Sequence, residues 1–156
     1  MNERTEITLK LLDTTKPDPG PRKGPSFTYP RWSLETKPYW DGCLRGELLY
    51  QKCRDCREVV FHPRAVCPYC LSSALDWEKS AGRGAIYSFT LLHIPLHRER
   101  PGKLPRALGI IALDEGFHMF SQIELPDGAE LRVGQRVQVY FDRVAEDLTL
   151  PKFRLA

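Results

Sequence analysis

The sequence predicts a mainly β protein, in which a short N-terminal helix and a metal-binding ribbon precede a five-stranded closed barrel. Two observations lead to this fold class. The stretch CRDCREVVFHPRAVCPYC holds two Cys-x-x-Cys pairs, and residues 84–156 consist of short runs of β-branched and aromatic residues separated by turn residues. A chain of 156 residues is long enough for two small modules. We expect an extension at residues 1–33, the helix and ribbon at 34–80, and the barrel at 81–156.

The N-terminal extension is rich in proline and glycine. Residues 1–30 carry five prolines and two glycines, a composition that does not form a helix or a central strand. Ahead of them, the run EITLKLL alternates apolar and polar residues and is typical of a short strand. Two interpretations stay open: a disordered tail, or a segment that lies along a surface of this chain or of a partner.

The start of the chain also bears on the compartment. Acidic residues occur among the first ten, no apolar core of a secretory signal follows, and no apolar run approaches the roughly 20 residues that cross a bilayer. We therefore expect a cytoplasmic protein without a membrane segment. In that compartment, cysteines serve as metal ligands or free thiols more often than as disulfides.

Residues 34–49 predict a short amphipathic helix. Thr36 is a suitable N-cap, Pro38 falls in the first turn, and Gly46 ends the helix. Apolar side chains at helical spacing form one face: Tyr39, Trp40, Cys43 and Leu44. We expect the fifth cysteine, Cys43, to pack there as a small apolar residue.

The remaining four cysteines predict a structural metal site. Cys53 and Cys56 form one pair and Cys67 and Cys70 the other, with ten residues between the pairs. Each Cys-x-x-Cys supplies two corners of a tetrahedron from one tight turn, so we expect zinc, or iron in its place. Four thiolates leave no position for water or substrate, so no metal catalysis is expected. A redox dithiol is disfavoured, because no βαβ pattern surrounds the pairs.

Five strand-like runs follow the cysteines, at residues 85–94, 107–113, 117–123, 136–141 and 150–155. The turn Asp114-Glu115-Gly116 predicts a hairpin in which Gly116 takes a positive φ. Five strands with one long connection after the first predict a barrel of the OB type. Alternation places most aromatic side chains in the barrel core, and Tyr140 on the outside beside Arg136.

Several stretches in order, from about Lys37 to the C-terminus, resemble the family first catalogued as domain of unknown function 35 (DUF35). They are KPYWDG, GELLYQKC, FHPRAVCPYC, SAGRGAIYSFT, LGIIALDEG and VGQRVQVYF. Members combine a rubredoxin-like zinc ribbon with a C-terminal OB-fold. Arg57 and Leu71 depart from the family pattern, because they stand where members often carry glycine. That departure puts the shape of the two metal-binding turns in doubt.

The resemblance implies a non-catalytic accessory subunit of a thiolase-superfamily enzyme that handles acyl-CoA thioesters. Such partners include ketoacyl-CoA thiolases, hydroxymethylglutaryl-CoA synthase, retro-aldolases that cleave steroid side chains, and acyltransferases. We expect the helix and ribbon to dock onto the partner, with four candidate aromatic residues: Tyr39, Trp40, Phe61 and Tyr69.

The connection HIPLHRERPGKLPR, residues 93–106, is the most basic stretch of the predicted barrel. Four cations there are candidates to contact phosphates of coenzyme A, or of RNA: Arg98, Arg100, Lys103 and Arg106. A solvated basic loop is the simpler alternative. Residues 84–156 as a whole hold nine basic and nine acidic residues, which disfavours a single-stranded nucleic-acid binder, the second functional hypothesis.

An independent enzyme is the third hypothesis. Polar residues of the predicted barrel show no nucleophile–base arrangement that the sequence can establish: Ser88, Asp114, Glu115 and His118.

Overall fold

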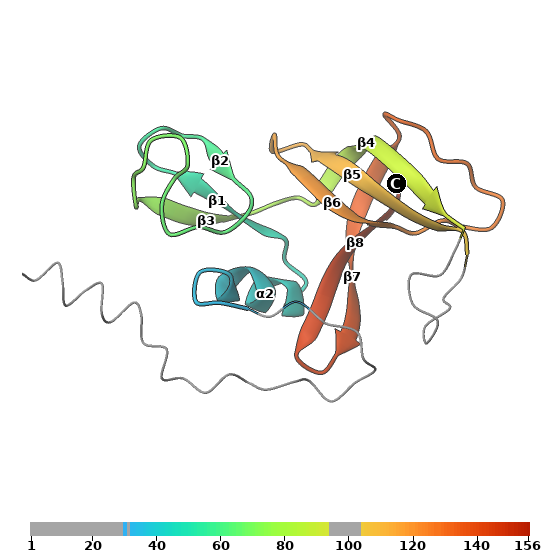
Figure 1. Ribbon diagram of the computed structural model, residues 1–156, viewed down its shortest axis with the longest axis horizontal. Helices are drawn as coiled ribbons and strands as arrows, with labels where there is room; N and C mark the ends of the chain where they lie inside the picture. Colours follow the sequence, from blue (N-terminus) through green and yellow to red (C-terminus); the bar gives the residue numbers. More distant parts are fainter. Residues whose placement is uncertain (1–29, 31, 94–103) are drawn as a thin grey trace, which may run out of the picture. The chain divides into compact units, whose positions relative to one another are not determined.

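The structure is a computed structural model that describes residue 30 and residues 32–93 and 104–156 (Figure 1). Its elements in chain order are α2 (Lys37–Leu44), β1 (Leu49–Cys53), β2 (Val59–Val60), β3 (Leu75–Lys79), β4 (Arg83–Leu92), β5 (Arg106–Leu113), β6 (His118–Ile123), β7 (Arg136–Ala145) and β8 (Leu148–Leu155). The strand expected near residues 6–12 lies outside the described residues. No helix in the described part of the chain is long and apolar enough to span a membrane.

The helix α2 is shorter than the predicted 34–49. Gly46 takes a φ of 76° just after the helix, which turns the chain away, and Leu49 already belongs to β1. Thr36 does precede the first helical residue, but its side chain does not cap the helix. Its Oγ1 instead accepts a hydrogen bond from the Ser33 backbone N–H at 2.7 Å. Thr36 is thus the N-cap residue, as predicted, but it caps without a side-chain hydrogen bond, and Pro38 lies in the first turn as expected.

The ribbon is a three-stranded antiparallel sheet in the order β2-β1-β3. The central strand β1 pairs through Gln51 with Val60 on one side and with Trp77 on the other. β1 ends at Cys53, so the sheet delivers the first cysteine directly from a hydrogen-bonded strand.

The barrel closes in the order β4-β5-β6-β8-β7, with β7 returning to β4. Neighbouring strands β6 and β8 are parallel, and the other four pairs of neighbours are antiparallel. A five-stranded closed barrel confirms the predicted OB-fold. Gly116 has a φ of 94° in the β5–β6 turn, which confirms its predicted role there.

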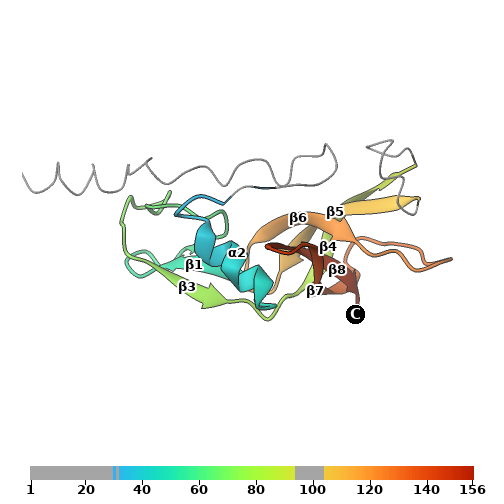
Figure 2. The same ribbon diagram turned by 90° about the horizontal axis from the view of Figure 1, so that it is seen from below.

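Helix, ribbon and barrel share one hydrophobic core. Phe61 of the ribbon stacks on Phe117 of the barrel, with ring centroids 4.6 Å apart and planes 10° apart. Tyr50 contacts the same Phe117 ring at 5.3 Å, and Tyr39 of α2 meets Phe61 edge-on at 6.0 Å. The helix also contacts β7 and β8, as the two views of Figures 1 and 2 show. The barrel thus supports the sheet that carries the cysteines.

Candidate metal centre

The first metal-binding turn, or knuckle, spans Cys53–Glu58 and is closed by two backbone hydrogen bonds. The Cys53 N–H donates to the Glu58 carbonyl at 3.0 Å, and the Arg57 N–H donates to the Cys53 carbonyl, also at 3.0 Å. These bonds fold the chain back on itself, so that Cys56 lies beside Cys53.

The second knuckle, Cys67–Ser72, repeats this backbone. The Cys67 N–H donates to the Ser72 carbonyl at 2.8 Å, and the Leu71 N–H donates to the Cys67 carbonyl at 2.9 Å. Arg57 and Leu71 occupy equivalent places and have φ values of 66° and 63°. This left-handed conformation favours glycine and costs another residue roughly 1 kcal/mol or more. Both side chains therefore strain their knuckle locally without changing its hydrogen bonds.

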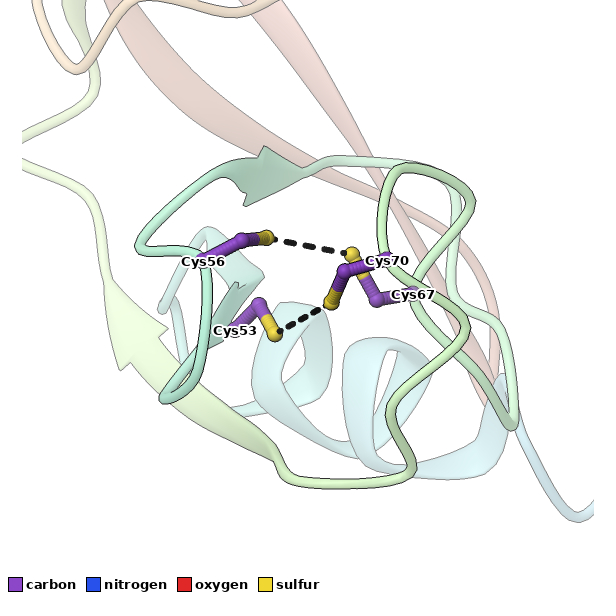
Figure 3. Close-up of side chains that lie close together, drawn as sticks. All are labelled: Cys53, Cys56, Cys67 and Cys70. Atoms are coloured by element: carbon purple, nitrogen blue, oxygen red, sulfur yellow. Dashed lines mark hydrogen bonds between the residues drawn. The ribbon is translucent and has the colours of Figure 1, made fainter.

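The knuckles bring four sulfur atoms together (Figure 3). The Sγ atoms of Cys53 and Cys70 lie 3.6 Å apart, as do those of Cys56 and Cys67. All four lie within 4.8 Å of one another, and none forms a disulfide. A tetrahedral ion with metal–sulfur distances of about 2.3 Å has sulfur–sulfur edges of about 3.8 Å. The four cysteines are therefore positioned to bind a metal ion with a closed, all-thiolate coordination.

Backbone amides tune the thiols. The N–H of Cys56, aided by that of Asp55, lowers the pKa of Cys53 to about 7, because these donors stabilise the thiolate. For Cys56 the Glu58 N–H also lowers the pKa, but burial and hydrogen bonds with the other thiols outweigh it and raise the pKa to about 12. Four neighbouring thiols do not all ionise by themselves, so a bound cation is what favours four thiolates.

Gln51 holds the second knuckle to the sheet. This buried side chain accepts a hydrogen bond from the Arg64 N–H at 2.8 Å and donates one to the Arg64 carbonyl at 3.1 Å. Both polar groups of the amide are thereby satisfied, and the segment leading to Cys67 is fixed against β1.

The fifth cysteine takes no part in the cluster. Cys43 is fully buried in the shared core, where burial raises the pKa of its thiol to about 12. The expectation that it packs as a small apolar residue is confirmed.

The residues expected to dock onto a partner fall into two groups. Tyr39 is buried, and Trp40 and Phe61 are half-buried against the shared core. Tyr69, in the second knuckle, is 66% exposed. Docking through Trp40, Phe61 or Tyr69 stays a prediction, while Tyr39 is occupied by packing inside the chain.

Three of the residues expected to contact phosphate, Arg98, Arg100 and Lys103, lie outside the described residues. Arg106 is half-buried at the start of β5 and lines a cavity of about 420 Å³ together with Tyr140. Glu124 and Asp127 line the same cavity, so the described part of its wall is not purely cationic. Phosphate binding there stays a prediction.

The structure also reveals an exposed aromatic face that sequence reasoning missed. Tyr87 of β4 and Phe120 of β6 are exposed, with Ile110 of β5 paired beside Phe120. Tyr140, which alternation placed outside, is half-buried instead. A signal was present for Phe120, because it lies out of phase with the inward Phe117 and Met119. For Tyr87 the signal was ambiguous: it is out of phase with the buried Ile86 but in phase with Phe89, which packs against the core, and the bulge between Ile86 and Ser88 breaks the alternation between the two rings.

Comparisons with known proteins match the same two modules. Residues 40–76 match the family model of the ChsH2 rubredoxin-like zinc ribbon domain, and residues 77–142 match that of the ChsH2 C-terminal OB-fold domain. A solved structure described as "Ltp2-ChsH2(DUF35) aldolase" has the same fold, with a TM-score of 0.73 at 24% identity over 81% of this chain and 98% of that chain.

Two relatives differ in how much of them this chain covers. A probable enoyl-CoA hydratase alpha subunit of Thermomonospora curvata is 24% identical over 99% of this chain, which spans only 44% of that relative. A DUF35 domain-containing scaffold protein of Methanothermobacter thermautotrophicus is 32% identical over 66% of this chain and 77% of its own length. With its zinc ribbon, its OB-fold and this degree of identity, the chain belongs to the DUF35 family.

Proposed function

We propose that this chain is a non-catalytic accessory subunit that binds a structural zinc ion and docks onto a thiolase-superfamily enzyme, where it shapes the acyl-CoA channel. One observation carries the proposal: a closed set of four cysteines sits in a ribbon that is packed onto the barrel, which suits a rigid scaffold. Such a subunit works where thiols stay reduced, in agreement with the expected cytoplasmic location.

Zinc is the proposed occupant of the cysteine cluster. Cys53, Cys56, Cys67 and Cys70 would hold it, and it would supply folding free energy to a ribbon with only a small core of its own. Iron fits the same tetrahedron, so the ion is identified by elemental analysis of protein purified without added metal. About one zinc per chain supports the proposal, and iron in its place contradicts this part of it.

The names of the relatives support a partnership, while the thiolase superfamily as partner follows from the family resemblance. One structural relative is described as "Ltp2-ChsH2(DUF35) aldolase", two relatives are named scaffold proteins, and two are named hydratase alpha subunits. The words subunit and scaffold in four of these names support an assembly for this chain as well. Acyl-CoA at the shared surface is the finer part of the proposal, with Arg106 as its described candidate.

The test is co-purification of the tagged, zinc-loaded full chain from its source organism, with mass spectrometry of the proteins retained. We expect a thiolase-superfamily enzyme at a fixed ratio to the chain. Retention of no such enzyme, in a preparation that contains bound zinc and melts cooperatively, would contradict the proposed function.

Single-stranded nucleic-acid binding is the alternative, and the exposed Tyr87 and Phe120 favour it, because OB-folds stack bases on outward aromatic rings. The side chains paired around Ile110 on that face carry no formal charge, whereas backbone phosphates require cations. The test is a labelled oligonucleotide titration at two salt concentrations. Salt-sensitive binding that is lost in Phe120→Ala would favour the alternative over the accessory subunit.

A further inference from the structure

Cys70 differs from the other three cysteines of the metal centre in its exposure. Cys53 and Cys67 are fully buried, and Cys56 is half-buried. Cys70, by contrast, is exposed at the surface of the second knuckle. The residues directly before and after it in the sequence are exposed as well, so no adjacent side chain buries it. The metal centre therefore presents one of its four ligand residues to solvent.

As a metal ligand, the sulfur of Cys70 is a thiolate. The four sulfur atoms occupy the corners of a closed site, and cysteines bind metal ions in the deprotonated form. The thiolate, and not the thiol, is the form that attacks oxidants, and oxidation of a cysteine also depends on its exposure. Cys70 has both properties. Cys43, whose buried thiol has a raised pKa, has neither.

A second cysteine is in position to react with an oxidised Cys70. The Sγ atom of Cys53 lies 3.6 Å from that of Cys70, across the gap between the two knuckles (Figure 3). The other sulfur pair at this distance, Cys56 and Cys67, does not include Cys70. A sulfenic acid condenses with a neighbouring thiol or thiolate to form a disulfide, so Cys53 is the residue expected to react next.

We infer that Cys70 is an oxidation site through which hydrogen peroxide releases the metal ion. The Cys70 thiolate attacks one peroxide oxygen, which breaks the O–O bond, leaves a sulfenic acid on the sulfur and releases hydroxide. The Cys53 thiolate then attacks the Cys70 sulfur, which forms the S–S bond and releases a second hydroxide. The two sulfur atoms lose two electrons to the peroxide, and two protons from solvent convert the hydroxides to water.

The disulfide leaves too few ligands for the ion. Only Cys56 and Cys67 remain as thiols of the cluster, and a closed tetrahedral site needs four donors. A dithiol reductant reverses the reaction, because it returns two electrons and two protons to the sulfur atoms. This oxidation differs from the activity of a redox dithiol, since the bond joins the two knuckles and not the two cysteines of one pair. The inference depends on the zinc of the proposed function and not on the partner enzyme.

The test uses the full chain purified with its zinc, whose content is measured before oxidant is added. Hydrogen peroxide is then added in small excess, and released zinc is followed with a chromogenic chelator. Trypsin cleaves after Arg54 and chymotrypsin after Tyr69, so mass spectrometry distinguishes the cysteines of each pair. We expect release of the zinc, one disulfide between Cys53 and Cys70, and an unmodified Cys43. Dithiothreitol and added zinc should restore the metal-bound chain.

Two variants with the same donor set separate exposure from metal binding. Cys70→His and Cys56→His each give a site of three cysteines and one histidine, which zinc also accepts, but only the first removes the exposed sulfur. Zinc content and melting temperature show that each variant is loaded and folded. We expect Cys70→His to release zinc about tenfold more slowly under peroxide than Cys56→His, which keeps both reacting sulfur atoms. The disulfide mapping in the wild-type chain tests the inference even where a variant fails to bind zinc.

Other outcomes overturn the inference. A disulfide within one knuckle, or between Cys56 and Cys67, would show that Cys70 and Cys53 are not the reacting pair. Equal release from the two histidine variants would show that the exposure of Cys70 does not direct the attack. Zinc that stays bound while free cysteine in the same solution is oxidised would show an inert site, and it would leave the proposed function standing. A chain that holds no zinc before oxidant is added contradicts the proposed metal, and the inference fails with it.

Discussion

The two knuckles have one backbone and two different surfaces. Each is closed by the same pair of backbone hydrogen bonds, and each has a residue with a left-handed backbone directly after its second cysteine. Around the first knuckle the side chains are charged, and Arg54 forms an ion pair with Asp76 at 3.5 Å. Around the second knuckle they are apolar, with Tyr69 and Leu71 exposed.

This difference separates what holds the metal from what the metal site presents. Cysteine spacing and backbone bonds are common to both knuckles, so they serve the ion. The exposed side chains differ, so they are not what holds the ion. Variants of the two knuckles test this separation.

Removing the cysteines of either knuckle should have the same effect. Cys53→Ser/Cys56→Ser and Cys67→Ser/Cys70→Ser each leave two thiols, too few for a closed site. Structural zinc contributes about 10–16 kcal/mol in zinc-finger peptides, so both variants should lose the ion and the fold of the ribbon. Elemental analysis and thermal melting of the full chain measure this. A pair variant that keeps one zinc per chain would show that the knuckles do not share the ion.

Loosening Gln51 should affect the second knuckle alone. Gln51→Leu keeps the volume roughly constant but removes both bonds to Arg64, which should cost about 1–3 kcal/mol of unfolding free energy. Amide exchange should accelerate in residues 64–72 and stay unchanged in residues 53–58. The control is Gln135→Leu, which removes an exposed side-chain bond to the Arg132 N–H in the barrel. Equal acceleration of exchange in both knuckles would contradict the conclusion that Gln51 holds only the second knuckle.

Removing the charge that pairs with Arg54 of the first knuckle should change the free energy of unfolding least. In Asp76→Asn the ion pair with Arg54 is lost, but both side chains are more than half exposed, so the free energy of unfolding should change by about 0.5 kcal/mol or less. Urea unfolding at low and high salt measures this. A loss well above that value would mean that the charged surface helps to hold the metal site, against the division drawn between the knuckles.

Sequence reasoning reached the metal site because its chemistry is local. Two Cys-x-x-Cys pairs fix donor type and spacing whatever surrounds them, and the strand alternation of β5, β6 and β7 fixes the barrel in a similar way. The effect of Arg57 and Leu71 on the shape of the two turns was less certain from the sequence. Their positions suggested an altered turn, whereas the structure keeps the turn and strains the residue, a choice decided by the balance of hydrogen bonds against backbone sterics.

What the sequence left open depends on contacts between distant segments. Tyr39 and Phe61 were candidates for docking, and only the position of Phe117, far along the chain, shows that both rings pack within the shared core. The bulge that breaks the alternation between Tyr87 and Phe89 is likewise a property of strand pairing and not of residue type. The limits of α2 depended on Leu49, which pairing with Lys79 draws into β1.

The stacked rings of Phe61 and Phe117 make the ribbon and the barrel depend on each other. Each ring covers the other, so either module expressed as a fragment would expose an aromatic ring to water. The predicted division between residues 80 and 81 therefore separates two segments of the sequence that share one hydrophobic core. Ribbon and barrel would have to diversify as an inseparable pair.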